Sequence, residues 1–144
     1  MENSEELKQF VDAILNLRMS MKQYVQKKIR EDKIDLTYEM LQVLAVLWTS
    51  GEMNQQDIAD KIQKNKASLT SLLDNLAKRN FIIRTEDPVD RRNKIISLTD
   101  EGKQQEGQIF PLLNQFYHTL HTGLSGKEIK QVTILLKKMQ NNIS

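Results

Sequence analysis

Hydrophobic residues recur every three or four positions near the start of the chain, at Leu7, Phe10, Val11, Ile14, Leu17, Met21, Tyr24, Val25 and Ile29. A helical period of 3.6 residues places all of these positions on one face. We therefore predict one long amphipathic helix from Glu5 to about Ile29.

Three shorter helical patterns follow, each behind a polar residue whose side chain can cap the first turn. With their capping residues, the predicted segments are Thr37 to Ser50, Asn54 to Ile62 and Asn65 to about Arg79. Gly51 ends the first of these helices. Asn80 stands where the last one needs a left-handed exit residue, and asparagine is the best choice there after glycine.

Two segments rich in β-branched residues, Phe81 to Glu86 and Lys94 to Leu98, lack a helical period, so we predict two antiparallel strands. The loop between them, residues 87–93, is longer than a tight hairpin needs, which favours a functional role. Thr99 can cap a following helix that should bend at Pro111. A capping box from Ser125 to Glu128 then precedes the last helix.

Two short helices joined by a tight turn and followed by a hairpin form a winged helix-turn-helix, whose second helix enters the major groove of DNA. The predicted fold is therefore mainly α: a winged helix-turn-helix head over residues 35–102 with a small β-hairpin wing, flanked by long helices in residues 1–34 and 104–144. The apolar stripes of these flanking helices exceed what one small head can bury. We expect them to form the dimerisation region of a homodimer, with residues 1–144 as one domain.

Composition narrows the functional classes. A chain of 144 residues with 39% hydrophobic and 28% charged residues has the size and composition of one globular domain. It contains no cysteine, which excludes disulfides and thiol-based sensing. The acidic, polar start lacks the pattern of a secretory signal, and no stretch is apolar enough to span a membrane, so we expect a cytoplasmic protein without a membrane partner.

Charge is unevenly distributed along the chain. Residues 61–94 contain nine lysines and arginines against four acids, a balance of +5, so the rest of the chain carries −3 of the net +2. A basic segment within a mildly acidic protein is typical of a phosphate-binding face. Small polar residues at the start of the second short helix can reach base edges or phosphates, and Arg91 and Arg92 of the wing suit a narrow minor groove.

The segment from about residue 36 to residue 102 resembles the MarR family of regulators. The matching residues are Leu36-Thr37, Gln55, Asp57-Ile58-Ala59, Lys66-Ala67-Ser68-Leu69-Thr70, Leu76, Asp87-Pro88-Val89-Asp90-Arg91-Arg92, Leu98-Thr99 and Gly102. The wing motif, Asp-Pro-x-Asp-Arg-Arg followed by Leu-Thr and then Gly, is the most specific part. The resemblance implies a homodimer with intertwined terminal helices that binds double-stranded DNA and regulates transcription, with repression as the simplest outcome.

The resemblance also implies roles for individual residues. Asp90 would orient the minor-groove arginine Arg92, and Arg91 would contact the DNA backbone. The complete set of expected DNA-contacting residues is Asn54, Gln55, Asn65, Lys66, Ala67, Ser68, Thr70, Ser71, Asn75, Arg84, Asp90, Arg91, Arg92 and Lys94. The chain departs from the family pattern at Ser71 and Asn75, where many members carry basic residues, and at Asn80, which replaces a glycine.

Family members commonly respond to small phenolic or aromatic acids that bind between the dimer helices and the head. The resemblance thus implies an effector pocket, for which Arg18, Met21, Tyr38 and Trp48 are the candidate lining residues. His118 and His121 have a spacing that suits a metal, but the sequence offers no third ligand, and we predict no metal site and no cofactor.

The sequence also bears on two other functional classes. With two histidines, no cysteine and no convergent pair of acids, the sequence does not predict an enzyme. The alternative to a DNA reader is a winged-helix module that docks protein partners through the same surface without sequence-specific DNA binding. Salt dependence separates the two, because phosphate contacts weaken steeply as salt rises.

Overall fold

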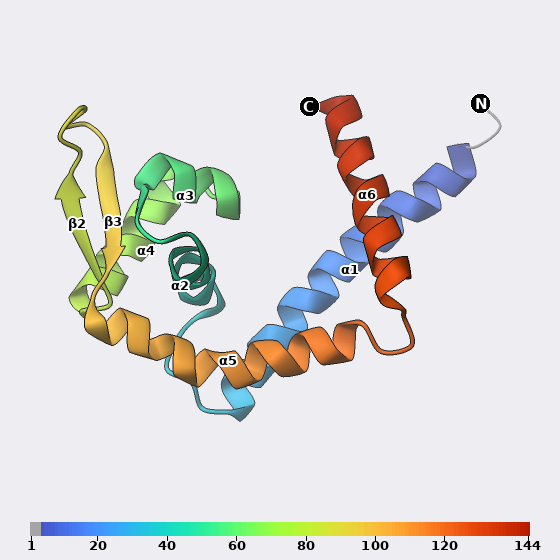
Figure 1. Ribbon diagram of the computed structural model, residues 1–144, viewed down its shortest axis with the longest axis horizontal. Helices are drawn as coiled ribbons and strands as arrows, with labels where there is room; N and C mark the ends of the chain where they lie inside the picture. The colour runs from blue at the N-terminus through green and yellow to red at the C-terminus, as the bar shows by residue number, and fades with distance from the viewer. Residues whose placement is uncertain (1–3) are drawn as a thin grey trace. The chain divides into compact units, whose positions relative to one another are not determined.

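The structure is a computed structural model that describes residues 4–144 (Figure 1). Its elements are α1 (Ser4–Glu31), α2 (Tyr38–Ser50), β1 (Met53–Asn54), α3 (Gln55–Ile62), α4 (Lys66–Lys78), β2 (Ile82–Glu86), β3 (Lys94–Leu98), α5 (Asp100–Leu120) and α6 (Gly126–Ile143). The mainly helical fold with a winged helix-turn-helix is thereby confirmed. The first three residues of the predicted range 1–34 lie outside the described part.

Side-chain caps begin the helices where the sequence predicts them. Thr37 accepts a hydrogen bond from the Met40 backbone N at the start of α2. Gly51, at φ 76°, ends that helix. Asn80 adopts φ 62°, which confirms the predicted left-handed exit after α4.

The sequence did not predict one of the three strands. β1 contains only Met53 and Asn54 and pairs with Ile96 and Ile95 of β3, so the sheet has the order β1-β3-β2. Two residues are too few to show an alternating pattern, and Asn54 also caps α3. The short strand ties the start of the helix-turn-helix to the wing.

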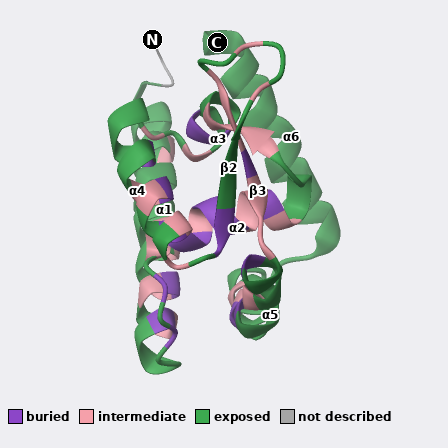
Figure 2. Ribbon diagram, turned by 90° about the vertical axis from the view of Figure 1, so that its left-hand side faces the viewer, coloured by how far each residue is buried: buried purple, intermediate pink, exposed green. Residues whose placement is uncertain are grey.

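The chain divides into two compact units, of which the first ends at Leu112 and the second runs from Leu113 to Ser144. α5 continues through Pro111, directly before this division. The first unit holds the buried core, whose largest fully buried side chains are Leu44, Leu47, Ile58, Leu69, Leu73, Leu76, Ile96, Ile109, Leu112 and Val43. Buried segments on α2 and at one end of β2 contrast with the tip of the hairpin, where no residue is buried (Figure 2).

The second unit contains α6, which begins with the predicted capping box. The Glu128 backbone N donates to Ser125 Oγ at 3.1 Å, and the Ser125 backbone N donates to Glu128 Oε1 at 3.0 Å. The hydrogen bond that the Ser125 backbone N donates to the carboxylate lowers the pKa of the Glu128 carboxyl. No residue of α6 is buried, although the helix carries an apolar stripe that includes Val132, Leu135 and Leu136.

Candidate nucleic-acid interface

Two asparagine caps shape the turn between α3 and α4. Asn54 Oδ1 accepts from the Asp57 backbone N, and Asn65 Oδ1 accepts from the Ser68 backbone N, each at 2.8 Å. Gln63 closes α3 in the left-handed conformation at φ 56°. Only Gln63, Lys64 and Asn65 therefore separate the two helices, which is the tight turn that a helix-turn-helix needs.

α4 presents one apolar face to the core and one polar face to solvent. Leu69, Leu73 and Leu76 are completely buried. The predicted groove-facing residues of this helix are all exposed, namely Lys66, Ala67, Ser68, Thr70, Ser71 and Asn75. The leucine spacing thus turns toward solvent the small polar side chains that can reach base edges.

A hydrogen-bond relay links α3 to α4 across the turn. Gln55 Nε2 donates to Thr70 Oγ1 at 2.8 Å, and Thr70 Oγ1 donates to the Lys66 carbonyl oxygen at 2.9 Å. Because a hydroxyl has a single proton, this arrangement commits the Thr70 donor to the backbone. Thr70 therefore offers DNA its methyl group and its remaining acceptor capacity, while Gln55 keeps one N–H and its carbonyl oxygen.

The loop of the wing is an ordered turn. The Asp87 backbone N donates to the Asn93 carbonyl oxygen at 3.1 Å, and the Asn93 backbone N donates to the Asp90 carbonyl oxygen at 3.0 Å. Asp90 Oδ1 accepts from the backbone N of Arg92 at 3.0 Å and from its Nε at 3.4 Å. The Arg92 side chain is nevertheless 94% exposed, so its guanidinium projects into solvent at the tip of the hairpin.

Four of the nine cations in residues 61–94 form ion pairs. Arg79 pairs with Asp35, Arg84 with Asp74, Arg92 with Asp90, and Lys94 with Glu86. The other five form no ion pair within residues 4–144: Lys61, Lys64, Lys66, Lys78 and Arg91. These five cations can neutralise phosphates without first breaking an internal pair.

A small cavity of about 50 Å³ lies where the wing meets the two short helices. Gln55 and Lys66 line it from the helices, and Arg92 and Lys94 line it from the wing. The structure therefore brings together four of the predicted DNA-contacting residues that are far apart in the sequence. Three of the four, Lys66, Arg92 and Lys94, are cations, and no acid among the described residues lines this cavity.

Sequence reasoning missed the acid that faces Arg84. Asp74 is the single acid of α4, and it holds the Arg84 guanidinium through Oδ1. Arg84 is the single cation of β2. One acid on a basic helix and one cation on the following strand were the available signal for this pair.

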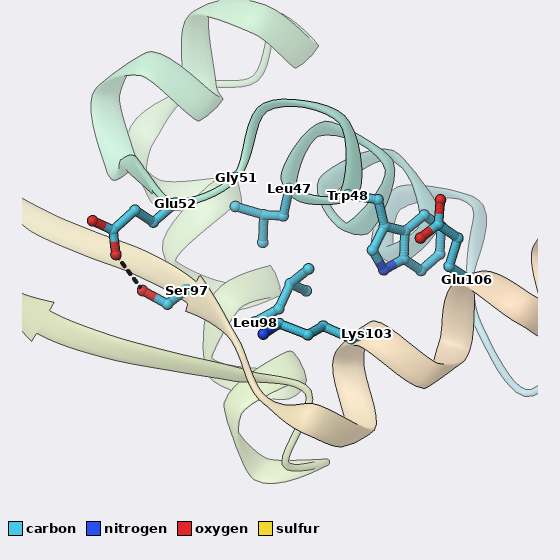
Figure 3. A pocket seen from close by; sticks show the side chains of 8 residues that line it. All are labelled: Leu47, Trp48, Gly51, Glu52, Ser97, Leu98, Lys103 and Glu106. Atoms are coloured by element: carbon cyan, nitrogen blue, oxygen red, sulfur yellow. Dashed lines mark hydrogen bonds between the residues drawn. The ribbon is translucent and has the colours of Figure 1, made fainter.

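Three of the four candidate effector residues line two separate cavities of the first unit. Arg18 and Tyr38 line a cavity of about 520 Å³ together with Leu15, Met19, Lys22, Gln42, Ile62, Gln63 and Lys64. Trp48 lines another of about 450 Å³, next to Leu47, Leu98, Lys103 and Glu106 (Figure 3). Met21 lines neither of these two cavities. Trp48 Nε1 donates to the Gly102 carbonyl oxygen at 2.9 Å, which gives this indole a structural role as well.

Among residues 4–144 there is no group of three or more histidines or acids placed to hold a metal ion. The same residues include no helix with both the length and the apolar character needed to cross a membrane.

Comparison with known sequences places the head among characterised families. The model of the MarR family matches residues 36–94. The HTH-type transcriptional regulator MhqR of Bacillus subtilis is 31% identical over 100 residues, which are 69% of this chain and 69% of MhqR. YkoM, an HTH-type transcriptional regulator of the same species, is 32% identical over 67% of this chain. The chain spans just under two thirds of three B. subtilis relatives, at 62% of YkoM, 64% of YwaE and 66% of YdgJ.

Solved structures agree with this match. MepR of S. aureus, in a crystal structure with DNA, is 27% identical and superimposes with a TM-score of 0.79 over 93% of this chain and 98% of MepR. A variant of E. coli MarR in complex with operator DNA also gives a TM-score of 0.79, over 93% of this chain and 95% of that one. At 21% identity this second likeness concerns the fold alone.

Proposed function

The chain belongs to the MarR family of transcriptional regulators, and from that premise we propose that it binds double-stranded DNA as a sequence-specific regulator. The observation that carries the proposal is the position of the wing cations beside the start of α4, around the cavity shared by Gln55, Lys66, Arg92 and Lys94. One recognition helix in the major groove and one arginine wing in the minor groove would use all four residues. The DNA complex of MepR supports the same use of this fold.

Unpaired cations would supply most of the affinity. Lys61, Lys64, Lys66, Lys78 and Arg91 carry no ion pair in the described chain, and each is available to a phosphate. Every phosphate that is neutralised releases bound counterions, so affinity should fall steeply with salt. The polar side chains of α4, together with Arg92, would supply the sequence preference.

We further propose that the regulator is a homodimer. α6 has no buried residue, and its exposed apolar side chains are Ile129, Val132, Ile134, Leu135, Leu136, Met139 and Ile143. α1 likewise exposes Leu7, Val11, Ile14, Leu15, Leu17 and Met19. Contact with a second copy through residues 1–34 and 104–144 would remove these stripes from water. The two heads, each formed by residues 35–102, would then bind half-sites about 10 base pairs apart on a pseudo-palindromic operator. The simplest effect of a dimer bound there is repression of transcription.

A small aromatic or phenolic acid is the effector that we propose for the cavity of Arg18 and Tyr38. The volume of about 520 Å³ lies in the range of small-molecule sites. Arg18 and Lys22 offer positive charge to a carboxylate, while Leu15, Met19 and Tyr38 offer apolar surface. A ligand at this place can release DNA only if it binds the DNA-free conformation more tightly.

The test is a fluorescence anisotropy titration of the purified protein against a pool of random-sequence duplex DNA at low and moderate salt. The key variant is Arg92→Ala, and the matched control is Arg30→Ala, which removes an exposed arginine of α1 outside the head. Salt-sensitive binding that Arg92→Ala weakens and Arg30→Ala preserves would support a DNA-reading wing. No binding of the wild-type protein at low salt would overturn the proposal in favour of a protein-docking module.

A further inference from the structure

An ion pair joins the recognition helix to the base of the wing. Arg84 of β2 donates through Nη1 to Oδ1 of Asp74, which lies on α4. The two side chains are 32% and 48% exposed, against 94% for Arg92 at the tip of the same hairpin. Both wing arginines pair with an acid, but Arg84 is the more enclosed of the two.

The register of the sheet explains why Arg84 faces the helix. Arg84 lies opposite Ile96 in the β2–β3 pair, and residues directly opposite share one face of a sheet. Ile96 is completely buried, and Ile82, two positions before Arg84 and therefore on the same face, is 3% exposed. Arg84 is therefore on the same face of the sheet as these two buried isoleucines, and from there its guanidinium pairs with Asp74 of α4.

The charge of Asp74 argues against a phosphate contact by Arg84. If Arg84 turned to a phosphate, the Asp74 carboxylate would remain unpaired on the helix that enters the groove and would repel the DNA. If Arg84 keeps Asp74, the pair is neutral and adds little to phosphate binding. The five unpaired cations of residues 61–94 carry no such penalty.

We propose that Arg84 is a positioning residue, which through its pair with Asp74 holds the wing at one distance from α4. This inference rests on the proposed DNA-binding function and narrows the set of residues that touch DNA. The pair fixes the wing relative to the recognition helix before DNA is bound. Neither element then has to be ordered as it enters its groove, and such preorganisation raises the affinity for DNA without adding a contact. Loss of the pair should therefore weaken binding while the number of phosphate contacts stays the same.

The test compares Arg84→Gln, Asp74→Asn, the double variant and Arg84→Lys on an operator duplex selected by the wild-type protein from a random pool. Glu86→Gln is the matched control, because it breaks the neighbouring pair with Lys94 on the same strand. We expect about a fivefold rise in Kd for each single variant, no further rise in the double variant, an unchanged salt slope and partial rescue by Arg84→Lys. Glu86→Gln should bind at least as tightly as the wild type.

A phosphate contact by Arg84 would give the opposite pattern. Arg84→Gln would lower the salt slope by about one, and Asp74→Asn would tighten binding more than Glu86→Gln does. Either of these results would overturn the inference.

Amide hydrogen exchange of the β2–β3 hairpin without DNA gives an independent readout. Exchange should be faster in Arg84→Gln and Asp74→Asn than in the wild type and Glu86→Gln. Equal exchange in all four proteins would show that the pair does not hold the wing, whatever the DNA titration gives. Failure of the wild type to bind any duplex would instead refute the proposed function, which keeps the two failures distinct.

Discussion

A Cβ atom on Gly102 would lie 2.1 Å from the carbonyl oxygen of Phe81. Gly102 stands in the first turn of α5, and Phe81 directly precedes β2. The same glycine donates its backbone N to Thr99 Oγ1 at 3.0 Å and accepts from Trp48 Nε1 at 2.9 Å. α2, α5 and the base of the wing therefore meet at a point where there is no room for a side chain.

We predict that Gly102→Ala destabilises the protein by at least about 2 kcal/mol, because the Phe81 backbone must move to admit the methyl group. Gly107→Ala is the matched control. It lies in the same helix, its added Cβ would meet nothing within 4 Å, and helix propensity favours alanine there by up to about 1 kcal/mol. Urea unfolding at one fixed protein concentration measures both changes. Equal stability of the two variants would contradict this account of Gly102.

Local signals made most of the head predictable. The caps Thr37, Asn54 and Asn65 act on the helices that the sequence indicates, because a capping side chain needs only the backbone three residues away. Asn80 adopts its left-handed conformation for an equally local reason. By contrast, β1 is a strand only because Met53 and Asn54 pair with residues of β3, so no local sequence pattern predicts it.

The candidate site was less accessible to sequence reasoning. Arg84 and Arg92 look alike in the sequence as cations of one basic segment. The difference between them arises from strand register and from Asp74 on another element, which only the tertiary structure reveals. The family resemblance grouped Trp48 and Tyr38 in one effector pocket, yet they line different cavities because they lie near opposite ends of α2.

The wing gives a second prediction. Asp90→Ala should weaken DNA binding by a smaller factor than Arg92→Ala does, because the arginine remains but loses the carboxylate that orients its backbone N and Nε. Asp90→Asn is the control, since the amide oxygen can still accept from Arg92 while the charge is lost. Anisotropy titrations of the three variants on one duplex decide the order. A larger loss for Asp90→Ala than for Arg92→Ala would assign the aspartate a direct role.

A third prediction concerns assembly. Leu135→Glu places a charge in the exposed apolar stripe of α6 and should shift the protein from dimer to monomer, if a second copy covers that stripe. Lys137→Glu, on the same helix, introduces the same residue at an exposed position that is already charged and serves as the control. Sedimentation at micromolar concentration should give twice the chain mass of 16.8 kDa for the wild type and the control. A monomeric wild type would refute the dimer.

The last prediction addresses the effector, with 2-hydroxybenzoate as the probe. If the cavity of Arg18 and Tyr38 binds aromatic acids, Arg18→Ala should weaken binding of the probe by about tenfold, through loss of the cation that faces the carboxylate. Trp48 is the single tryptophan of the chain and lines a different cavity, so its fluorescence reports whether a ligand at Arg18 affects α2 at a distance. The matched control is Lys103→Ala, which removes a cation from the Trp48 cavity instead.

Calorimetric titrations of the probe with and without operator duplex then measure the coupling between effector binding and DNA binding. An effector that releases DNA must bind more weakly when the duplex is present, since binding both states equally cannot shift the equilibrium. Weaker binding in Lys103→Ala but not in Arg18→Ala would move the site to the Trp48 cavity.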